Sequence, residues 1–403
     1  MNQVIVIGGG ASGMMAALTA AEDKNNRVLL LERQQRLGKK LLATGNGRCN
    51  LTNTGATAAR YHGEDPSFVL PVLTKYPPEA VLARFHALGL LTVTEPSGRV
   101  YPLSDTAGSV VDVLRFALAN AGVELRTACP ARELWRENGG YAVRTDTETL
   151  HADDLIVACG GPAGEKLGGV MDGFTLLRPL GHKATALRPA LVQLLTAPEY
   201  PRALKGVRCE AALRLLAGAD CAAQSEGELQ FTEKGVSGPA VFEVSRAASV
   251  RGGALTLCAD FLRNYDGDTV FALLRQRRSA LPELPAGELL TGMLHNRLGK
   301  MLLKYASVEQ NRPLGSLSDR ELGRAARACK DFRLPVTGTE GFDHAQVTAG
   351  GLRTAAFDPE TLESWFMPRL FVCGELLDVD GDCGGFNLQW AWASGLVAGR
   401  LGK

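Results

Sequence analysis

The stretch that decides the fold is "QVIVIGGGASG", which runs from Gln3 to Gly13. Its "VIVI" part is an uninterrupted β-branched run, as expected of a strand buried on both faces of a parallel sheet. Gly8, Gly10 and Gly13 then follow in G-x-G-x-x-G spacing. In dinucleotide-binding folds these glycines permit a tight turn, the close approach of a pyrophosphate and the packing of helix on strand. The helix-forming run "SGMMAALTAAE" comes next and offers its N-terminal N–H groups to the phosphates.

A second apolar run, "RVLLLE", ends at Glu32, which lies 19 residues beyond Gly13. A carboxylate at this distance accepts hydrogen bonds from ribose hydroxyls and would repel a 2′-phosphate, which favours FAD or NAD over NADP. Strand, glycines, helix and acid follow in the order that the motif requires. The sequence therefore predicts a dinucleotide site, and the alternative is a glycine-rich turn in another kind of α/β unit.

The next stretch, "LGKKLLATGNGRCNLTN" from Leu37 to Asn53, distinguishes between the two cofactors. A domain that binds only NAD usually continues directly into its next βα unit, whereas here a polar, glycine-rich loop follows the second strand. Lysine, arginine, asparagine and threonine side chains supply donors, and two glycines allow the backbone to approach a ligand. These features favour FAD lying extended across the sheet edge. The alternative is a solvated turn with a helix cap.

The C-terminal segment "GDCGGFNLQWAWASG", Gly381–Gly395, is predicted to complete the cofactor site. Reduced flavin carries negative charge at N1 and O2, which a helix N-terminus stabilises. We expect the turn from Gly384 to Asn387 to face the flavin ring. The small residues that follow at helical spacing are predicted to pack against the alanine-rich helix after Gly13, and both tryptophans are expected to be packing residues.

The rest of the chain predicts an α/β protein with an insertion. "GLLTVTEPSGRVYPLS" indicates a hairpin, and "DTAGSVVDVLRFALANAGV" followed by "VELRT" indicates a helix and a return to the sheet. Short strands and then a helical segment occupy the middle of the chain. The predicted division is an FAD-binding part at 1–184, a β-rich insert at 185–262, a mainly helical insert at 263–340 and a C-terminal FAD-binding part at 341–403.

Composition argues against several other classes of protein. The 403 residues carry a formal net charge of +1, so no global field attracts nucleic acid or an anionic membrane. Nine cysteines without a C-x-x-C pair argue against a disulfide framework, a zinc site and a thioredoxin-type redox pair. The chain enters a strand at once and has no run of about 20 apolar residues. We therefore expect a soluble, cytoplasmic protein with no metal, no membrane partner and no nucleic-acid partner.

The sequence resembles the BaiN/YhiN-like flavoproteins, which include the aminoacetone oxidase family. The resemblance covers nearly the whole chain, and its most specific motifs are "GKKLLATGNGRCNLTN" and "LFVCGELLDVDGDCGGFNLQWAWASG". Further landmarks occur in the same order: Gly98–Leu114, Asp153–Ala163, Phe231–Arg246 and Gln346–Thr354. The resemblance implies an FAD-dependent oxidoreductase with a glutathione-reductase-like FAD-binding Rossmann domain, an inserted β-rich subdomain and a small helical subdomain.

Motif and resemblance together give the candidate cofactor-binding residues: Gly8, Gly10, Ala11, Ser12, Gly13, Glu32, Arg33, Lys40, Gly45, Asn46, Gly47, Arg48, Cys49, Asn50, Ala131, Gly160, Gly161, Gly374, Glu375, Asp378, Gly384, Gly385, Phe386 and Asn387. Arg48 and Tyr101 are candidate substrate residues. No catalytic base is identified, because none of the six histidines lies in a recognised motif, and Cys49 has no partner cysteine nearby in the sequence.

The predicted function is hydride transfer between FAD and a small organic substrate, with O2 or NAD(P)H as redox partner. No second G-x-G-x-x-G follows a strand, so the chain lacks a Rossmann unit of its own for NAD(P)H. This absence favours an amine oxidase such as an aminoacetone oxidase. The alternatives are an NAD(P)H-dependent reductase of an enone-type bile-acid or steroid-like substrate, an RNA-modifying flavoprotein and a non-catalytic flavin-binding protein.

Overall fold

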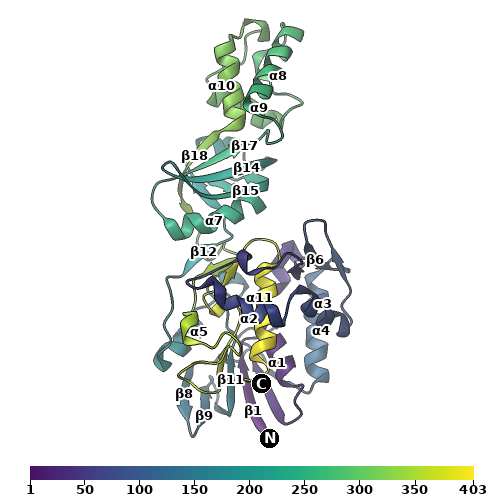
Figure 1. Cartoon of the computed structure of the whole chain (residues 1–403), viewed down its shortest axis with the longest axis vertical. Coiled ribbons are helices and arrows are strands. Elements are labelled where there is room, and N and C mark those ends of the chain that lie inside the picture. Colours follow the sequence, from purple (N-terminus) through teal and green to yellow (C-terminus); the bar gives the residue numbers. More distant parts are fainter. The chain divides into compact units, whose positions relative to one another are not determined.

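The computed structural model describes residues 1–403 and divides them into two compact units (Figure 1). Unit 1 consists of Met1–Arg188 and Phe342–Lys403, so the two ends of the chain fold together, and unit 2 is Pro189–Gly341. The predicted class is confirmed: unit 1 is an α/β Rossmann-type domain, and the inserted unit holds a β-barrel and helices. The finer division into four segments stays a prediction.

The core of unit 1 is a five-stranded sheet in the order β20-β11-β1-β2-β7, with every neighbouring pair parallel. Its strands are β1 (Asn2–Ile7), β2 (Asn26–Leu31), β7 (Glu124–Arg126), β11 (Asp154–Val157) and β20 (Leu370–Val372). The central strands are apolar because a parallel sheet of this kind is buried on both faces. This arrangement places the carboxyl ends of β1, β2, β11 and β20 along one edge, where open α/β sheets bind ligands.

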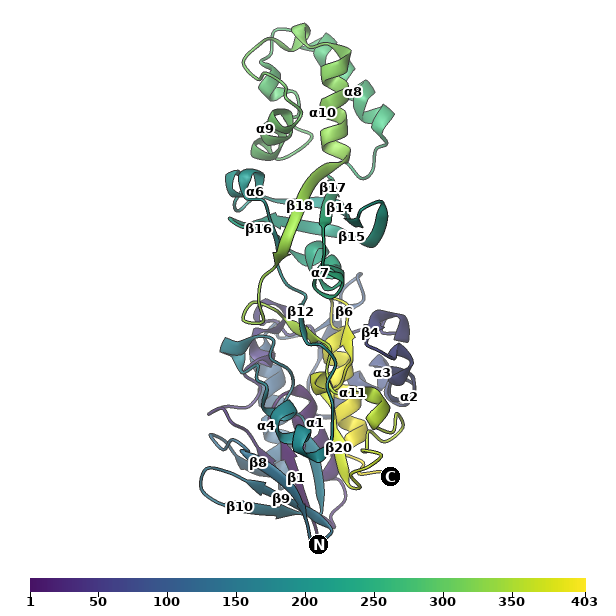
Figure 2. The same ribbon diagram turned by 90° about the vertical axis from the view of Figure 1, so that its left-hand side faces the viewer.

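Three helices carry the parts of unit 1 that matter for the site: α1 (Ala11–Ala20), α4 (Ala107–Asn120) and α11 (Phe386–Ala398). Figure 2 shows α1 and α11 side by side, although they come from opposite ends of the chain. A Cβ atom at Gly395 would lie 2.5 Å from the Ser12 carbonyl oxygen, and one at Gly399 would lie 2.6 Å from that of Ala16. The predicted packing of the small-residue face of α11 on α1 is therefore confirmed.

Short antiparallel sheets complete unit 1. The predicted hairpin forms from β5 (Thr92–Thr94) and β6 (Arg99–Pro102), and β6 also pairs with β3 (Thr52–Asn53). A second small pairing joins β4 (Tyr61–His62) to β21 (Asp380–Gly381). A further sheet, not predicted from the sequence, consists of β8 (Glu133–Glu137), β9 (Gly140–Arg144) and β10 (Thr149–Ala152). The remaining α-helices and strands before Arg188 and after Phe342 are α2 (Val69–Lys75), α3 (Pro78–Ala87), α5 (Asp172–Leu177) and β19 (Val347–Ala349).

Unit 2 contains a closed barrel in the order β13-β16-β15-β14-β17-β18. Its strands are β13 (Leu194–Thr196), β14 (Arg208–Ala217), β15 (Asp220–Phe231), β16 (Gly235–Ser237), β17 (Leu255–Asp260) and β18 (Phe332–Thr339). The accompanying helices are α6 (Glu199–Ala203), α7 (Pro239–Arg251), α8 (Gly267–Ala280), α9 (Asn296–Tyr305) and α10 (Asp319–Lys330). Helices α8 to α10 lie in the sequence between β17 and β18. β12 (Arg188–Ala190) spans the junction between the two units in the sequence.

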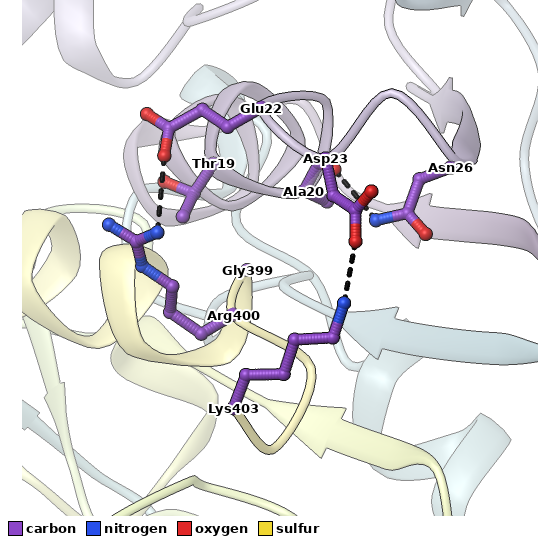
Figure 3. Close-up of a pocket in the computed structure, with 8 residues that line it drawn as sticks. All are labelled: Thr19, Ala20, Glu22, Asp23, Asn26, Gly399, Arg400 and Lys403. Atoms are coloured by element: carbon purple, nitrogen blue, oxygen red, sulfur yellow. Dashed lines mark hydrogen bonds and ion pairs between the residues drawn. The ribbon is translucent and has the colours of Figure 1, made fainter.

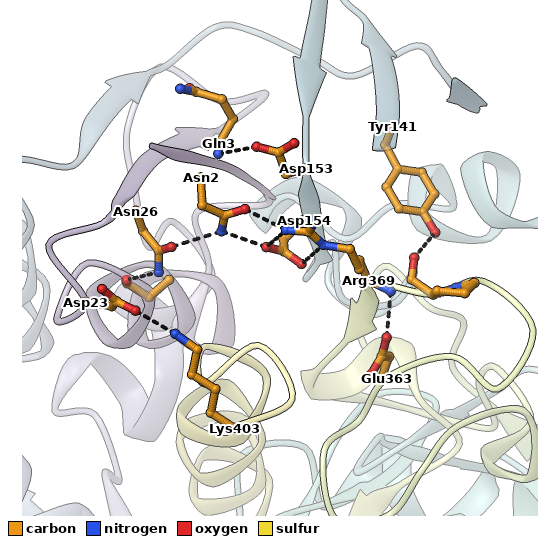
Figure 4. A network of polar contacts seen from close by, with 12 residues as sticks. Asn2, Gln3, Asp23, Asn26, Tyr141, Asp153, Asp154, Glu363, Arg369 and Lys403 are labelled. Atoms are coloured by element: carbon orange, nitrogen blue, oxygen red, sulfur yellow. Dashed lines mark hydrogen bonds and ion pairs between the residues drawn. The ribbon is translucent and has the colours of Figure 1, made fainter. Parts of the chain in front are cut away.

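A buried polar network fixes the end of the unit 1 sheet that lies opposite the glycine turn (Figure 4). Asp154, 4% exposed at the start of β11, accepts hydrogen bonds from Arg369 Nε at 2.8 Å and Nη2 at 2.7 Å. It also accepts one from Asn2 Nδ2 at 2.7 Å. This charge-assisted contact ties the first residues of β1 and β11 to the residue before β20.

No helix of the protein is both long enough and apolar enough to cross a membrane.

Candidate cofactor and active site

The turn between β1 and α1 has the geometry of a phosphate-binding loop. Gly8 has a φ of +112°, and a Cβ atom there would lie 2.4 Å from the Ala158 carbonyl oxygen. A Cβ atom at Gly13 would lie 1.8 Å from the Gly8 oxygen, whereas one at Gly10 would meet nothing within 4 Å. The outer glycines therefore serve packing, and the middle one faces open space. Gly10 also begins α1 without a side-chain cap, which leaves the first N–H groups of the helix available to an anion.

Glu32 lies beside this turn at the end of β2 and is 8% exposed. Its carboxylate accepts hydrogen bonds from the Gly9 N–H at 2.8 Å and the Gln34 N–H at 2.6 Å. Burial raises the pKa of Glu32, and the two backbone donors oppose that shift. A carboxylate has about four acceptor positions, so room remains for ribose hydroxyls. Of the other residues predicted for this region, Ala131 is buried in the core and Arg33 pairs with Asp172 at 3.2 Å.

A second group of predicted residues meets around Glu375. Lys40 Nζ lies 2.7 Å from Glu375 Oε2, and the Thr348 N–H donates to Glu375 Oε1 at 2.7 Å. A Cβ atom at Gly161 would lie 3.3 Å from Glu375 Oε1, and one at Gly160 would lie 4.0 Å from Glu375 Oε2. Gly374 faces α1, because its Cβ atom would lie 2.4 Å from Ser12 Oγ. Segments that are far apart in the sequence thus converge at the carboxyl ends of the sheet.

Asp378 lies outside this group and belongs to the turn that follows. Its carboxylate accepts a hydrogen bond from the Glu64 N–H at 3.0 Å, and burial raises its pKa. A Cβ atom at Gly63 would lie 2.2 Å from the Asp378 carbonyl oxygen. In this structure Asp378 therefore holds the segment around Gly63 in place.

The N-terminus of α11 is the other helix end at the site. Gly385, with a φ of +102°, begins α11 without a side-chain cap. A Cβ atom there would lie 2.5 Å from the Thr52 carbonyl oxygen and 2.8 Å from Asn50 Oδ1. Asn50 Oδ1 is buried and makes no hydrogen bond. Asn387 closes the preceding turn, because its side chain accepts from the Gly381 N–H and donates to the Gly381 oxygen, both at 2.8 Å.

The two uncapped helix N-termini point in the same direction but are offset along the helix axis. The contacts of Gly395 with Ser12 and of Gly399 with Ala16 make α1 and α11 parallel. Gly395 lies nine residues after the start of α11, whereas Ser12 lies one residue after the start of α1. At about 1.5 Å per residue, the N-terminus of α11 extends about 12 Å beyond that of α1. An extended dinucleotide such as FAD fits these features: the open turn at Gly8–Gly13 (the glycine cradle), the unpartnered Asn50 oxygen and the two helix ends.

The candidate substrate residues Arg48 and Tyr101 are brought together next to this site. The Arg48 guanidinium lies over the Tyr101 ring, 4.0 Å from its centroid. Arg48 is held there by Asp105 and by Glu95, the latter at 3.3 Å. A Cβ atom at Gly45 would lie 3.3 Å from Tyr101 Cε1, so the ring packs on the predicted glycine loop. Gly45, Asn46 and Gly47 all have positive φ values, which form the tight bend of this loop.

Cys49 is buried in the same loop, and burial raises its pKa to about 12. A thiol with so high a pKa is protonated at neutral pH and is a poor nucleophile. The nine cysteines are all free, so the structure offers Cys49 no disulfide partner. These observations give no support to a redox role for this residue.

Several polar residues next to the α11 turn were not predicted from the sequence. Asn53 Nδ2 donates to the Gly384 oxygen at 2.9 Å, and a Cβ atom at Gly384 would lie 3.2 Å from Arg99 Nε. His62 Nε2 lies 2.7 Å from Asp382 Oδ1, because β4 pairs with β21. Asn53 is the last residue of the Leu37–Asn53 motif, so its place at the site was predictable. His62 lies in no motif, and only the strand pairing reveals its position.

A hollow of about 310 Å³ lies at the far ends of α1 and α11, beside Gly399 (Figure 3). Its charged side chains are paired: Arg400 with Glu22 at 3.3 Å and Lys403 with Asp23 at 2.6 Å. The hollow adjoins the C-termini of the two helices, whereas the glycine cradle adjoins their N-termini. We therefore do not assign it to the cofactor site.

Comparisons with known proteins identify a family and several similar proteins. A family model described as the HI0933-like protein Rossmann domain matches residues 2–401. The 3-dehydro-bile acid delta(4,6)-reductase of Clostridium scindens is 41% identical over 372 residues, which cover 92% of this chain and 91% of that protein. The ribosomal RNA dihydrouridine synthase of Escherichia coli is 28% identical and covers 89% of this chain and 87% of its own length.

Among solved structures, the 3-ketosteroid delta1-dehydrogenase of Sterolibacterium denitrificans superposes with a TM-score of 0.53. The match covers 99% of both chains at 15% identity. At this identity the likeness concerns the fold.

Proposed function

The chain belongs to the HI0933-like Rossmann family and is an FAD-dependent oxidoreductase, and we propose that it reduces a carbon–carbon double bond conjugated to a carbonyl group in a small, steroid-like substrate. The observation that carries this proposal is the 41% identity to a bile-acid delta(4,6)-reductase over nearly the whole length of both proteins. The dihydrouridine synthases support the same reaction type, because saturating a uracil ring also adds hydrogen to a conjugated double bond.

The proposed roles of the residues follow the geometry of the two helix ends. We assign the pyrophosphate to the Gly8–Gly13 turn, a ribose to Glu32 and the polar chain of the cofactor to the region of Lys40 and Glu375. The N-terminus of α11 then stabilises negative charge on the flavin ring. When bound there, FAD supplies hydride transfer to the substrate. The two electrons come from a dihydronicotinamide donor such as NADH or NADPH.

An RNA substrate is less well supported by the charges of the chain. The most basic segment, "RQRR" at 275–278, lies on α8, and Arg278 is used within unit 2. Arg278 donates to the Leu317 oxygen at 2.7 Å and pairs with Asp319 at 2.8 Å. Affinity for nucleic acid depends on unpaired cations that neutralise phosphates. A small molecule therefore remains the preferred substrate class.

The amine oxidase predicted from the sequence is the competing activity, and one experiment separates the two. The enzyme is loaded with FAD and mixed anaerobically in two half-reactions, with loss and return of the visible flavin absorbance as the signal. For a reductase, NADH or NADPH bleaches the flavin, and a 3-keto-4,6-diene bile acid restores its colour. For an amine oxidase, aminoacetone bleaches the flavin and air restores it, while the bile acid has no effect. The second pattern would refute the proposal.

A salt-dependent binding assay with ribosomal RNA provides the remaining control. We expect weak binding that is lost with added salt. Tight binding together with reduction of uridine in that RNA would replace the small-molecule proposal.

A further inference from the structure

Tyr101 lies on a strand face that is turned towards the glycine turn before α11. Side chains two residues apart on a strand lie on the same face, so Arg99 and Tyr101 of β6 share one. Asn53 of β3 pairs directly with Arg99 and lies on that face as well. Asn53 and Arg99 both reach Gly384, through a hydrogen bond of 2.9 Å and an approach of 3.2 Å to its Cβ position. Tyr101 is therefore the next side chain along a face that borders the proposed flavin position.

The ring of Tyr101 is held in place from two sides. Arg48 covers one face at 4.0 Å from the centroid, and a Cβ atom at Gly45 would lie 3.3 Å from Cε1. Arg48 cannot swing away freely, because Asp105 and Glu95 bind its guanidinium. The residue as a whole is 6% exposed. A ring fixed in this way keeps its hydroxyl in a defined position, which general acid catalysis requires.

The hydroxyl of Tyr101, in contrast to its ring, has no partner. Two other buried tyrosines of unit 1 donate to backbone oxygens: Tyr61 to Phe386 at 3.0 Å and Tyr141 to Pro368 at 2.8 Å. No protein group forms a hydrogen bond with the Tyr101 hydroxyl oxygen, and that oxygen is not completely buried. It is therefore at least partly open to solvent. Structural tyrosines usually have their hydroxyl satisfied, so an open one on a clamped ring calls for a functional explanation.

We propose that Tyr101 is the catalytic acid that protonates the α-carbon of the conjugated double bond, an inference that rests on the proposed function. Hydride addition at the β-carbon leaves an electron pair delocalised over the α-carbon and the carbonyl oxygen. The Tyr101 O–H bond then breaks and a C–H bond forms at the α-carbon, which completes a two-electron reduction. The resulting tyrosinate regains its proton from water.

The charges around the ring fit both states of this cycle. Burial raises the pKa of Tyr101, and Glu95 adds to that shift, so the phenol is protonated at neutral pH. Arg99 and Arg48 act in the opposite direction and stabilise the tyrosinate once the proton has left. The same arginine that clamps the ring thus lies next to the charge that develops during proton transfer.

The test compares Tyr101→Phe with Tyr141→Phe, which also removes a buried tyrosine hydroxyl but lies outside the site. Each FAD-loaded protein is reduced with dithionite and mixed anaerobically with the 3-keto-4,6-diene bile acid. We expect Tyr101→Phe to slow flavin reoxidation by roughly 10²- to 10⁴-fold, the usual contribution of a positioned acid. Its dissociation constants for FAD and for the bile acid, measured by titration of the oxidised protein, should stay within about twofold of the unmodified values. Tyr141→Phe should reoxidise at the normal rate.

The outcomes separate the two proposals. If Tyr101→Phe reoxidises as fast as the unmodified protein, Tyr101 is not the acid, while the reductase proposal stands. If Tyr101→Phe loses affinity for FAD or for the bile acid in proportion to its rate, the residue is structural and the inference is wrong. If the unmodified reduced protein is not reoxidised by the bile acid, the proposed function fails and the role of Tyr101 fails with it.

Discussion

The turn before α11 permits a sharp test of the cofactor site through Gly385→Ala. Gly385 has a φ of +102°, and a Cβ atom there would lie 2.5 Å from the Thr52 oxygen and 2.8 Å from Asn50 Oδ1. The left-handed conformation costs an alanine about 1–2 kcal/mol, and the overlap with β3 adds about 1–3 kcal/mol. We therefore expect the free energy of unfolding to fall by about 2–5 kcal/mol.

The effect on FAD should be separable from the effect on stability. The overlap is relieved when the first turn of α11 moves away from β3, and the free N–H groups of that turn move with it. A helix terminus contributes up to about 2 kcal/mol to the stabilisation of a nearby charge. At about 1.4 kcal/mol per tenfold change, the dissociation constant of FAD should rise roughly tenfold to thirtyfold. Fluorescence titration of the apoprotein with FAD measures this change.

Gly122→Ala is the matched control. Gly122 also has a positive φ, of +75°, but a Cβ atom there would meet nothing within 4 Å. It should lose about 1–2 kcal/mol of stability from conformation alone and should bind FAD normally. If Gly385→Ala bound FAD as tightly as Gly122→Ala, the placement of the α11 turn at the cofactor would be refuted.

Two further predictions concern groups outside the cofactor site. His182 stacks on Phe357 and lies tilted against Phe366, its Nδ1 has no partner, and burial lowers its pKa from 6.5 to about 4. The unfolded chain therefore binds the proton first as pH falls, and the free energy of unfolding should drop by up to about 3 kcal/mol between pH 6.5 and pH 4. Urea titrations of His182→Gln should show a smaller drop over the same pH range. A drop as large as that of the unmodified protein would contradict the role given to His182. Asp154→Asn weakens the paired contact with Arg369 and should lower the free energy of unfolding by about 2–4 kcal/mol in thermal unfolding. Asp146→Asn, which loses the exposed pair with Arg132, is the control and should be neutral. Equal effects of the two variants would show that the buried network does not stabilise the protein more than an exposed ion pair.

Local sequence signals predicted those parts of the molecule whose contacts are local or repetitive. The glycine turn, the strand before it, the helix after it and the hairpin of β5 and β6 follow from short-range spacing. The packing of α11 on α1 was also predictable, because small residues at helical spacing leave a flat face that fits another small-residue helix. The sheet of β8, β9 and β10 was not predicted, although the sequence holds a signal for its first hairpin, the dipeptide Asn138-Gly139. In the structure these two residues have φ values of 50° and 84°, as a tight hairpin turn requires.

The sequence by itself predicted a dinucleotide site with one part near each end of the chain, because each part is encoded in consecutive residues. Only the tertiary structure decided which side chains meet there. Lys40 and Glu375, whose side chains pair, are 335 positions apart, and Tyr101 shares a strand face with Asn53 only because β6 pairs with β3. Such pairings depend on how strands and helices pack, and no periodicity along the chain records them.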